Sequence, residues 1–204
     1  MGAECLPILA ATYDSAIALV RRPIAGTEPR VVQRVIDFDR IAELKGTHVD
    51  DIFCALGTTI RKAGSKDAFR KVDYGYPLAA ANWGRANGAK QFVLVSSAGA
   101  AAASSNFYLS VKGELEDQLA GLGFASLRIF RPSMLLGARG ETRPGERLGQ
   151  WAVRGLHYAL AGPLEKYRGM PAGKLAIAMA AAAAAGEPGR RVYHWREIMQ
   201  LAGK

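Results

Sequence analysis

The chain has little cysteine, no long apolar stretch and no block of like charge. Its 204 residues contain only two cysteines, Cys5 and Cys54, whose spacing matches no CxxC or Cys/His motif, so we expect no metal site. Such sparse cysteine is typical of a reducing compartment, and we expect a cytoplasmic location. The longest apolar run, residues 175–185, has about half the length that spans a bilayer, and residues 1–7 lack the basic start of a signal peptide. We therefore expect no membrane partner.

The residues that are present fit a folded domain with a basic surface. Half of the chain is hydrophobic and 22% is charged, which excludes wholesale disorder. Lys and Arg number 27 against 18 Asp and Glu, a net charge of +9. This balance is compatible with nucleic acid, an anionic surface or a phosphorylated small molecule as partner. Because the charges are scattered and no zinc, helix-turn-helix or aromatic-basic signature accompanies them, we expect a small-molecule substrate and no nucleic acid.

Short apolar runs alternate with helical segments along the chain. Strands are expected at residues 15–20, 34–38, 51–56, 91–95, 125–130 and 191–195, and helices at 65–87, 106–122, 146–160 and 173–185. This alternation predicts an α/β fold with a doubly wound parallel sheet covered on both faces. We expect residues 1–204 to form a single domain, with the part from about residue 137 onward forming a lobe on the substrate side.

The ends of the expected strands carry the candidate site, because ligands of doubly wound sheets bind at the carboxyl ends of the strands. Polar or basic residues stand at all five strand ends of the sheet, where the loops begin at Arg21, Asp37, Ala55, Ser96 and Arg131. The strands that lead to these loops are apolar.

The strongest catalytic candidates are Tyr108 and Lys112 in the segment YLSVK. Residues four apart share a helix face, so the phenol and the ammonium can point into one site. A nearby positive charge favours the phenolate form of a phenol, and a serine from VSSAGA at the preceding strand end can hold a carbonyl or alcohol oxygen. This trio suits proton transfer coupled to hydride transfer from a nicotinamide. A YxxxK pair alone also occurs by chance in many helices.

Other strand ends predict contacts with a dinucleotide. Arg21 and Arg22 end a strand where an acidic residue would read the ribose of NAD, and guanidinium groups there favour the 2′-phosphate of NADP. A solvent-facing basic turn is the alternative. The pair Asp37 and Phe38 is a candidate contact for the adenine edge. In the loop Ala55, Leu56, Gly57, Thr58 and Thr59, the glycine allows close approach of the backbone to a ligand, although a plain turn has the same pattern.

Taken together, these segments resemble a known family. VSSAGA, YLSVK, LRIFRPS, RPGE, ALVRRP, DDIFCALGTT and FRKVDYGYP are similar to the atypical short-chain dehydrogenase/reductases, in their Tat-interacting oxidoreductase-like branch, over nearly the whole chain. The resemblance implies an NAD(P)-binding Rossmann-like fold with Ser97, Tyr108 and Lys112 as catalytic residues. Ser96 competes with Ser97, since spacing does not separate neighbours. The resemblance further implies cofactor contacts from Lys112, Arg131 and Ser133, besides those already named, and we add a homo-oligomer as a further expectation.

The chain departs from this family at its start. The usual first strand and its Gly-rich turn are lacking, and Gly2 stands where the last glycine of that turn would fall. This turn normally holds the pyrophosphate at a helix N-terminus, so we expect NADP(H) to bind weakly. Either the sequence starts after the strand or the protein has lost tight binding, and the intact Ser/Tyr/Lys set favours the first interpretation. Two functions remain open. The first is an NADP(H)-dependent oxidoreductase acting on a small carbonyl or alcohol, and the second is a non-catalytic dinucleotide sensor or protein-interaction module.

Overall fold

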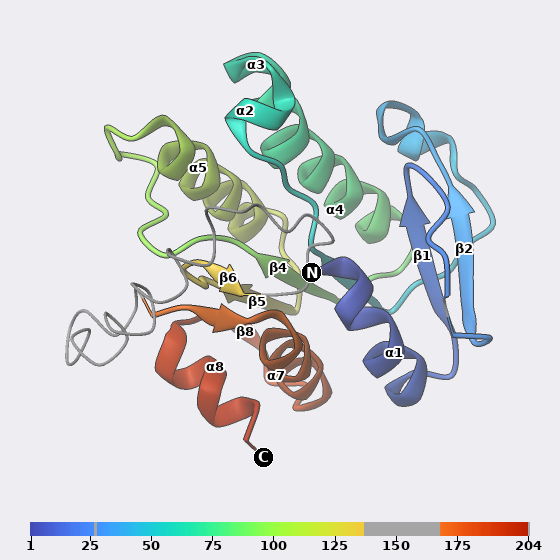
Figure 1. Ribbon diagram of the computed structural model, residues 1–204. Coiled ribbons are helices and arrows are strands. Elements are labelled where there is room, and N and C mark those ends of the chain that lie inside the picture. Colours follow the sequence, from blue (N-terminus) through green and yellow to red (C-terminus); the bar gives the residue numbers. More distant parts are fainter. Residues whose placement is uncertain (27, 137–167, 204) are drawn as a thin grey trace.

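The computed structural model describes residues 1–26, 28–136 and 168–203, which form an α/β arrangement with parallel strands (Figure 1). The strands are β1 (Ala16–Val20), β2 (Val31–Val35), β3 (Asp51–Cys54), β4 (Gln91–Val95), β5 (Ser126–Phe130), β6 (Leu135–Leu136), β7 (Met170–Pro171) and β8 (Gly189–Tyr193). The largest sheet has the order β3-β4-β5-β8, and every pairing in it is parallel. The predicted fold class is therefore confirmed.

Helices connect these strands and cover the sheet. They are α1 (Gly2–Thr12), the 3-10 helix η1 (Phe38–Glu43), α2 (Ile60–Ala63), α3 (Lys66–Arg70), the π-helical turn η2 (Lys71–Gly75), α4 (Tyr76–Ala86), α5 (Phe107–Gly121), α7 (Ala172–Ala184) and α8 (Trp195–Leu201). Figure 1 shows α4 and α5 on one side of the sheet and α7 and α8 on the other. No helix in the described part of the chain is long and apolar enough to cross a membrane.

The core consists of one apolar layer on each face of the larger sheet. Alternate residues of β4 illustrate this, because Phe92 and Leu94 pack with the α4–α5 layer whereas Val93 and Val95 pack with α1, α7 and α8. Both cysteines are buried in these layers, and burial raises the pKa of each thiol from 9.0 to about 11. At neutral pH both thiols are therefore protonated and poor nucleophiles.

Side-chain caps fix where the helices near the carboxyl edge begin. Thr59, Ser65 and Asn106 each accept a hydrogen bond from a backbone N–H one turn later and so start α2, α3 and α5. The long helix predicted for residues 65–87 is present as α3, η2 and α4 in succession, with its middle widened into a π-helical turn. The structure contains the helices predicted at 106–122 and 173–185 and the strands predicted at 15–20, 51–56, 91–95, 125–130 and 191–195. Their ends differ from the prediction by at most two residues.

The second predicted strand is misplaced. Val31–Val35 forms β2, which pairs in parallel with β1, whereas we expected this strand at residues 34–38. The strand ends before Asp37 because the carboxylate of Asp37 accepts a hydrogen bond from the N–H of Asp39 and caps the helix η1. Phe38, the first residue of η1, is buried in the core. The helix predicted at 146–160 lies outside the described residues, and the short strands β6 and β7 and helix α2 were not predicted.

The sheet is broken between β1 and β3. β1 pairs with β2 in a separate two-stranded sheet, and within the described residues no strand joins this pair to the four-stranded sheet. Figure 1 shows β1 and β2 standing apart beside the larger sheet. Within the described residues, the four-stranded sheet therefore ends at β3 on this side.

Candidate functional site

The loops that follow β4 and β5 are held together at the carboxyl edge of the larger sheet. The N–H of Ser96 donates to the carbonyl of Phe130 at 2.7 Å, and the N–H of Ala98 donates to the carbonyl of Pro132 at 2.8 Å. Because these bonds extend the β4–β5 ladder beyond both strands, Ser96 and Ser97 occupy fixed positions beside the start of the loop at Arg131.

Helix α5 docks closely on the loop that follows Ser97. Gly113 allows this approach, since a Cβ there would lie 2.2 Å from the backbone of Ala101 and Ala102. The N–H of Ala101 also donates to the carbonyl of Leu109 at 3.2 Å. The first turns of α5, which carry Tyr108 and Lys112, therefore lie against the loop that begins with the two serines.

Lys112 is buried and its ammonium is paired. Its Nζ lies 2.7 Å from Oδ1 of Asp73 in η2, and the two side chains are only 5% and 1% exposed. The second carboxylate oxygen of Asp73 accepts the N–H of Thr58 at 2.7 Å. Burying an ion pair costs free energy of desolvation, and the attraction between the two charges together with hydrogen bonds such as that from Thr58 offsets this cost. The pair thus ties α5 and η2 to the loop that follows β3.

Gly57 lies directly against this ion pair. A Cβ at Gly57 would lie 3.2 Å from Oδ1 of Asp73 and 3.7 Å from Nζ of Lys112, so the glycine leaves the pair room beneath the exposed backbone of the loop. The structure therefore brings the predicted loop at Ala55–Thr59 together with Lys112. Tyr108, one turn before Lys112 on α5, is half-buried, with its ring centroid 5.5 Å from that of Phe69.

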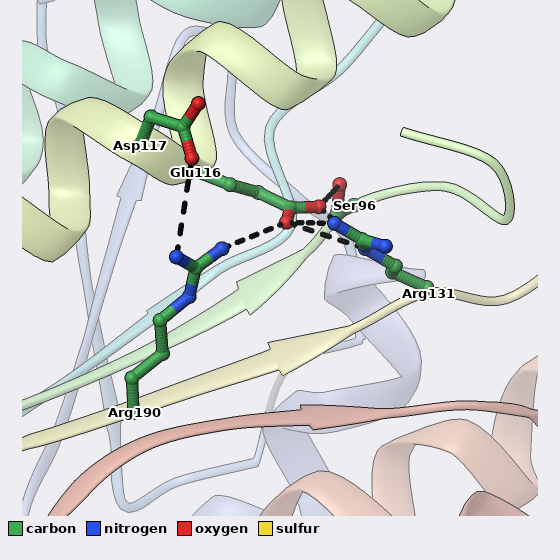
Figure 2. Close-up of polar contacts among 5 residues, drawn as sticks. All are labelled: Ser96, Glu116, Asp117, Arg131 and Arg190. Atoms are coloured by element: carbon green, nitrogen blue, oxygen red, sulfur yellow. Dashed lines mark hydrogen bonds and ion pairs between the residues drawn. The ribbon is translucent and has the colours of Figure 1, made fainter. Parts of the chain in front are cut away.

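Ser96 and Ser97 differ sharply in their surroundings. The Ser96 hydroxyl is buried and donates to Oε1 of Glu116 at 2.5 Å, so it is committed to a structural contact (Figure 2). Ser97 is half-buried, and its hydroxyl forms no hydrogen bond with another residue of the described ranges. This contrast supports Ser97 over Ser96 as the serine available to a ligand.

Glu116 is the centre of a charged cluster formed with Ser96, Arg131 and Arg190. Its carboxylate is fully buried on α5 and binds the Arg131 guanidinium through contacts of 2.6–3.2 Å. Arg190 of β8 approaches the same carboxylate at 3.5 Å and reaches Asp117 at 3.9 Å. Figure 2 shows both guanidinium groups converging on Glu116. Arg131, which was predicted to contact cofactor, is therefore held by a buried carboxylate with 21% of its side chain exposed.

The predicted cofactor residues fall into two groups. Arg21, Arg22, Phe38, Ala55 and Leu56 line one cavity of about 510 Å³ beside β1 and β3. Gly57, Thr58, Thr59, Arg131 and Ser133 stand on loops outside this lining, and Asp37 is exposed beside it with its carboxylate turned to Asp39. The Ser133 hydroxyl donates to the carbonyl of Arg168. The structure thus places five of the predicted cofactor residues around one cavity and the others on loops along the carboxyl edge of the sheet.

Sequence reasoning missed two buried carboxylates, those of Asp73 and Glu116. A signal was present for both: Asp73 lies four residues from Phe69 and from Pro77 on a buried helical stripe, and Glu116 lies four residues after Lys112. An acidic side chain on an apolar stripe needs a cationic or hydrogen-bonding partner when it is buried. Such a residue is therefore a candidate member of a buried ion pair.

The parallel sheet with helices on both faces defines a class, the Rossmann-like α/β fold. Among solved structures, MoeE5 in complex with UDP-glucose and NAD has a TM-score of 0.68 at 13% identity, and the match covers 99% of this chain and 77% of that one. Human epimerase family protein SDR39U1 with NADPH has a TM-score of 0.56 at 16% identity, covering 90% and 66% of the two chains. At these identities the likeness concerns the fold alone.

Sequence relatives identify the family. Protein HTATIP2 of Rattus norvegicus is 44% identical over 149 residues, covering 69% of this chain and 60% of the rat protein. Protein FMP52-1, mitochondrial, of Scheffersomyces stipitis is 39% identical over 175 residues, covering 82% and 76%. No family model matches the chain. The chain belongs to the atypical short-chain dehydrogenase/reductases, in the branch that contains HTATIP2 and FMP52. It spans less than two thirds of the rat protein's length.

These relatives correct the expected location. The proteins of Scheffersomyces stipitis, Candida albicans and Debaryomyces hansenii are named as mitochondrial, which contradicts our expectation of a cytoplasmic protein. The expectation was wrong because sparse cysteine indicates only that disulfides are not needed. It does not distinguish among compartments in which thiols stay reduced.

Proposed function

We propose that this chain is an NADP(H)-dependent oxidoreductase that interconverts small carbonyl compounds and alcohols through Ser97, Tyr108 and Lys112. The observation that carries the proposal is the contact of Lys112 with the Gly57 loop. It joins the helix face that bears Tyr108 to the loop expected to approach the dinucleotide. Membership of a dehydrogenase/reductase family supports the same chemistry.

The residues beside the 510 Å³ cavity fit the adenosine end of NADP. Arg21 and Arg22 are exposed at the carboxyl end of β1, where guanidinium groups can bind a 2′-phosphate through charge-assisted hydrogen bonds. Phe38 and Leu56 provide apolar surface for a flat ring in the same cavity.

The three catalytic candidates take different roles in carbonyl reduction. When bound, the nicotinamide supplies the hydride. Ser97 donates a hydrogen bond to the carbonyl oxygen and orients it, and the Tyr108 hydroxyl gives that oxygen its proton. The Lys112 ammonium then stabilises the phenolate left on Tyr108 by its charge. Asp73 fixes the position of the ammonium and partly compensates this charge.

Substitution of the two serines tests the assignment of roles. We expect Ser97→Ala to lower kcat with little change in the free energy of unfolding. We expect Ser96→Ala to lower stability instead, by about 1–3 kcal/mol, because it leaves the buried Glu116 carboxylate short of one donor. Urea denaturation and NADPH consumption, measured on both variants, separate the two effects. A loss of kcat confined to the Ser96 variant would reverse the assignment.

A second substitution tests the cofactor preference. The double variant Arg21→Ala/Arg22→Ala should weaken NADPH binding about tenfold or more, since hydrogen bonds to a charged group contribute about 1.5–3 kcal/mol each, and leave NADH binding unchanged. Isothermal titration with both nucleotides measures this. Arg85→Ala/Lys90→Ala removes the same charge from exposed residues outside the cavity lining and serves as the control. Equal losses for the two nucleotides, or for the two double variants, would contradict the assignment.

A non-catalytic dinucleotide sensor is the second candidate function. The buried Lys112–Asp73 pair favours the sensor function. The negative charge of Asp73 offsets that of the Lys112 ammonium, so the ammonium stabilises a phenolate on Tyr108 less than an unpaired ammonium would. The two functions differ in one observable. A sensor binds NADP(H) but shows no nicotinamide oxidation with any small aldehyde or ketone, whereas the oxidoreductase shows turnover that depends on Tyr108.

A further inference from the structure

The face of the larger sheet that α7 and α8 cover contains a buried arginine. Arg128 lies in the middle of β5 and is only 1% exposed. Its neighbours Leu127 and Ile129 pack with the α4–α5 layer, whereas Phe130 packs with α7 and α8. Because side chains alternate along a strand, Arg128 points to the same face as Phe130. It therefore lies on the opposite side of the sheet from the catalytic candidates on α5.

Two nitrogens of the Arg128 guanidinium have no partner in the part of the chain that the structure describes. Its Nε and Nη2 atoms are buried and form no hydrogen bond there. The other buried polar side chains of this face bind one another or the backbone. The Ser126 hydroxyl donates to Oε1 of Gln91 at 2.6 Å, and Nε2 of Gln91 donates to the carbonyl of Ala183 at 3.2 Å. A buried charge without a partner is costly, so Arg128 is a candidate contact for an anion.

The elements around Arg128 supply no acceptor for these nitrogens. Residues 172–184 of α7 contain no acidic, amide or hydroxyl side chain. On α8, the carboxylate of Glu197 is directed to the start of its own helix, where Oε2 accepts the N–H of His194 at 2.9 Å. On β8, the register partner of Arg128 is Arg191, so a second guanidinium stands beside it rather than a carboxylate. The negative charge that a buried guanidinium needs therefore does not come from these two helices or from β8.

A cavity of about 470 Å³ lies beside this part of the sheet, between β8 and α8. Its lining includes Arg191 of β8 and, from α8, Met199 and Gln200. Since Arg191 and Arg128 are register partners on one face of the sheet, Arg128 stands behind Arg191 as seen from the cavity. Arg191 keeps 48% of its side chain exposed, and its surface pair with Glu187 is of a kind that contributes little to stability. The Arg191 side chain can therefore turn aside and open the cavity toward Arg128.

The two unpartnered nitrogens form the side-on fork of the guanidinium. Arg131 uses the same two atoms in this chain, because its Nε and Nη2 bind the Glu116 carboxylate through contacts of 2.6–3.2 Å. The spacing of these N–H groups matches two coplanar oxygens of a carboxylate or a phosphate group. A halide ion offers a single acceptor and so fits the fork less well. The group that satisfies Arg128 is therefore an oxyanion.

We propose that Arg128 anchors an anion-binding site, which takes the carboxylate or phosphate group of a small molecule through the cavity between β8 and α8. The fork of Arg128 donates two hydrogen bonds to the oxyanion, and its charge is neutralised by the ligand. Arg191 and Gln200 provide further donors along the cavity. The site lies on the other face of the sheet from α5 and requires no nucleotide, so this inference does not depend on the proposed function.

The test measures the stability of the full chain in different salts of equal ionic strength. The probes are sodium acetate and inorganic phosphate, the reference is sodium chloride, and the readout is the midpoint of urea denaturation without nucleotide. We expect at least one oxyanion to raise the midpoint above that in chloride, with the logarithmic dependence on concentration that a ligand of the native state produces. A response to acetate alone identifies a carboxylate as the recognised group, and a response to phosphate alone identifies a phosphate. Midpoints in both oxyanions equal to those in chloride would overturn the proposal.

Three variants assign the response to the guanidinium. Arg128→Met should raise the midpoint in chloride, because it no longer buries an unpaired charge, and should abolish the additional response to the oxyanion. Arg128→Lys keeps the charge without the fork and should weaken the apparent affinity at least about tenfold. Arg61→Met removes the same charge from an exposed residue of α2 and should keep the response of the wild-type chain.

Two outcomes with these variants would contradict the site. A lower midpoint for Arg128→Met in chloride would show that the protein itself compensates the charge of Arg128. An undiminished oxyanion response in either Arg128 variant would show that the anion binds elsewhere.

Discussion

Replacing Tyr108 by phenylalanine is expected to lower kcat for carbonyl reduction by a factor of about 10²–10⁴, the usual contribution of a positioned proton donor. The dissociation constant for NADPH should stay nearly unchanged, because the residues beside the 510 Å³ cavity that fit adenosine do not include Tyr108. The decrease of NADPH absorbance with a panel of small aldehydes and ketones measures kcat, and isothermal titration measures the dissociation constant for NADPH.

Tyr193→Phe provides the matched control for this substitution. Tyr193 is buried on β8 and stacks on Phe130 in the layer formed with α7 and α8, on the opposite face of the sheet from α5. Removal of its hydroxyl should therefore leave kcat unchanged. Undiminished kcat in the Tyr108 variant would assign the proton donor to another group, and no activity in the wild-type chain would favour the sensor.

Local sequence patterns were sufficient for the central strands and the main helices. β4 is buried along its whole length, as expected for a continuous apolar run in a parallel sheet. β2 was harder, because residues 31–38 contain apolar side chains on both sides of the true boundary. Its position depends on the register with β1 and on the cap that Asp37 gives to η1, and both are tertiary or local hydrogen-bonding effects.

The helix face that carries Tyr108 and Lys112 was predictable, but the partners of its charged residues were not. Helical spacing places Tyr108 and Lys112 together whatever surrounds them. Asp73 stands far from Lys112 in the sequence, and the two meet only because η2 and α5 pack at the same edge. The sequence likewise predicted a missing strand, but only the structure shows that β1 and β3 remain apart around a cavity.

Replacing Glu116 by leucine is expected to destabilise the chain by about 3–5 kcal/mol, because breaking a buried ion pair leaves a charge without its partner. Glu116 is fully buried, but Arg131 and Arg190 keep 21% and 39% of their side chains exposed, which favours the lower part of this range. Urea denaturation measures the loss as a lower midpoint at an unchanged slope.

Glu114→Leu is the control, since it removes a carboxylate from the same helix. Glu114 pairs with Arg70, and both side chains are partly exposed, at 34% and 42%, so we expect a change of about 0–1 kcal/mol. The double variant Glu116→Leu/Arg131→Leu should recover part of the stability, because it removes the unpaired guanidinium as well as the carboxylate. If the double variant is less stable than Glu116→Leu alone, the Arg131 side chain stabilises the strand end by packing rather than by charge, and the ion pair is not what joins α5 to β5.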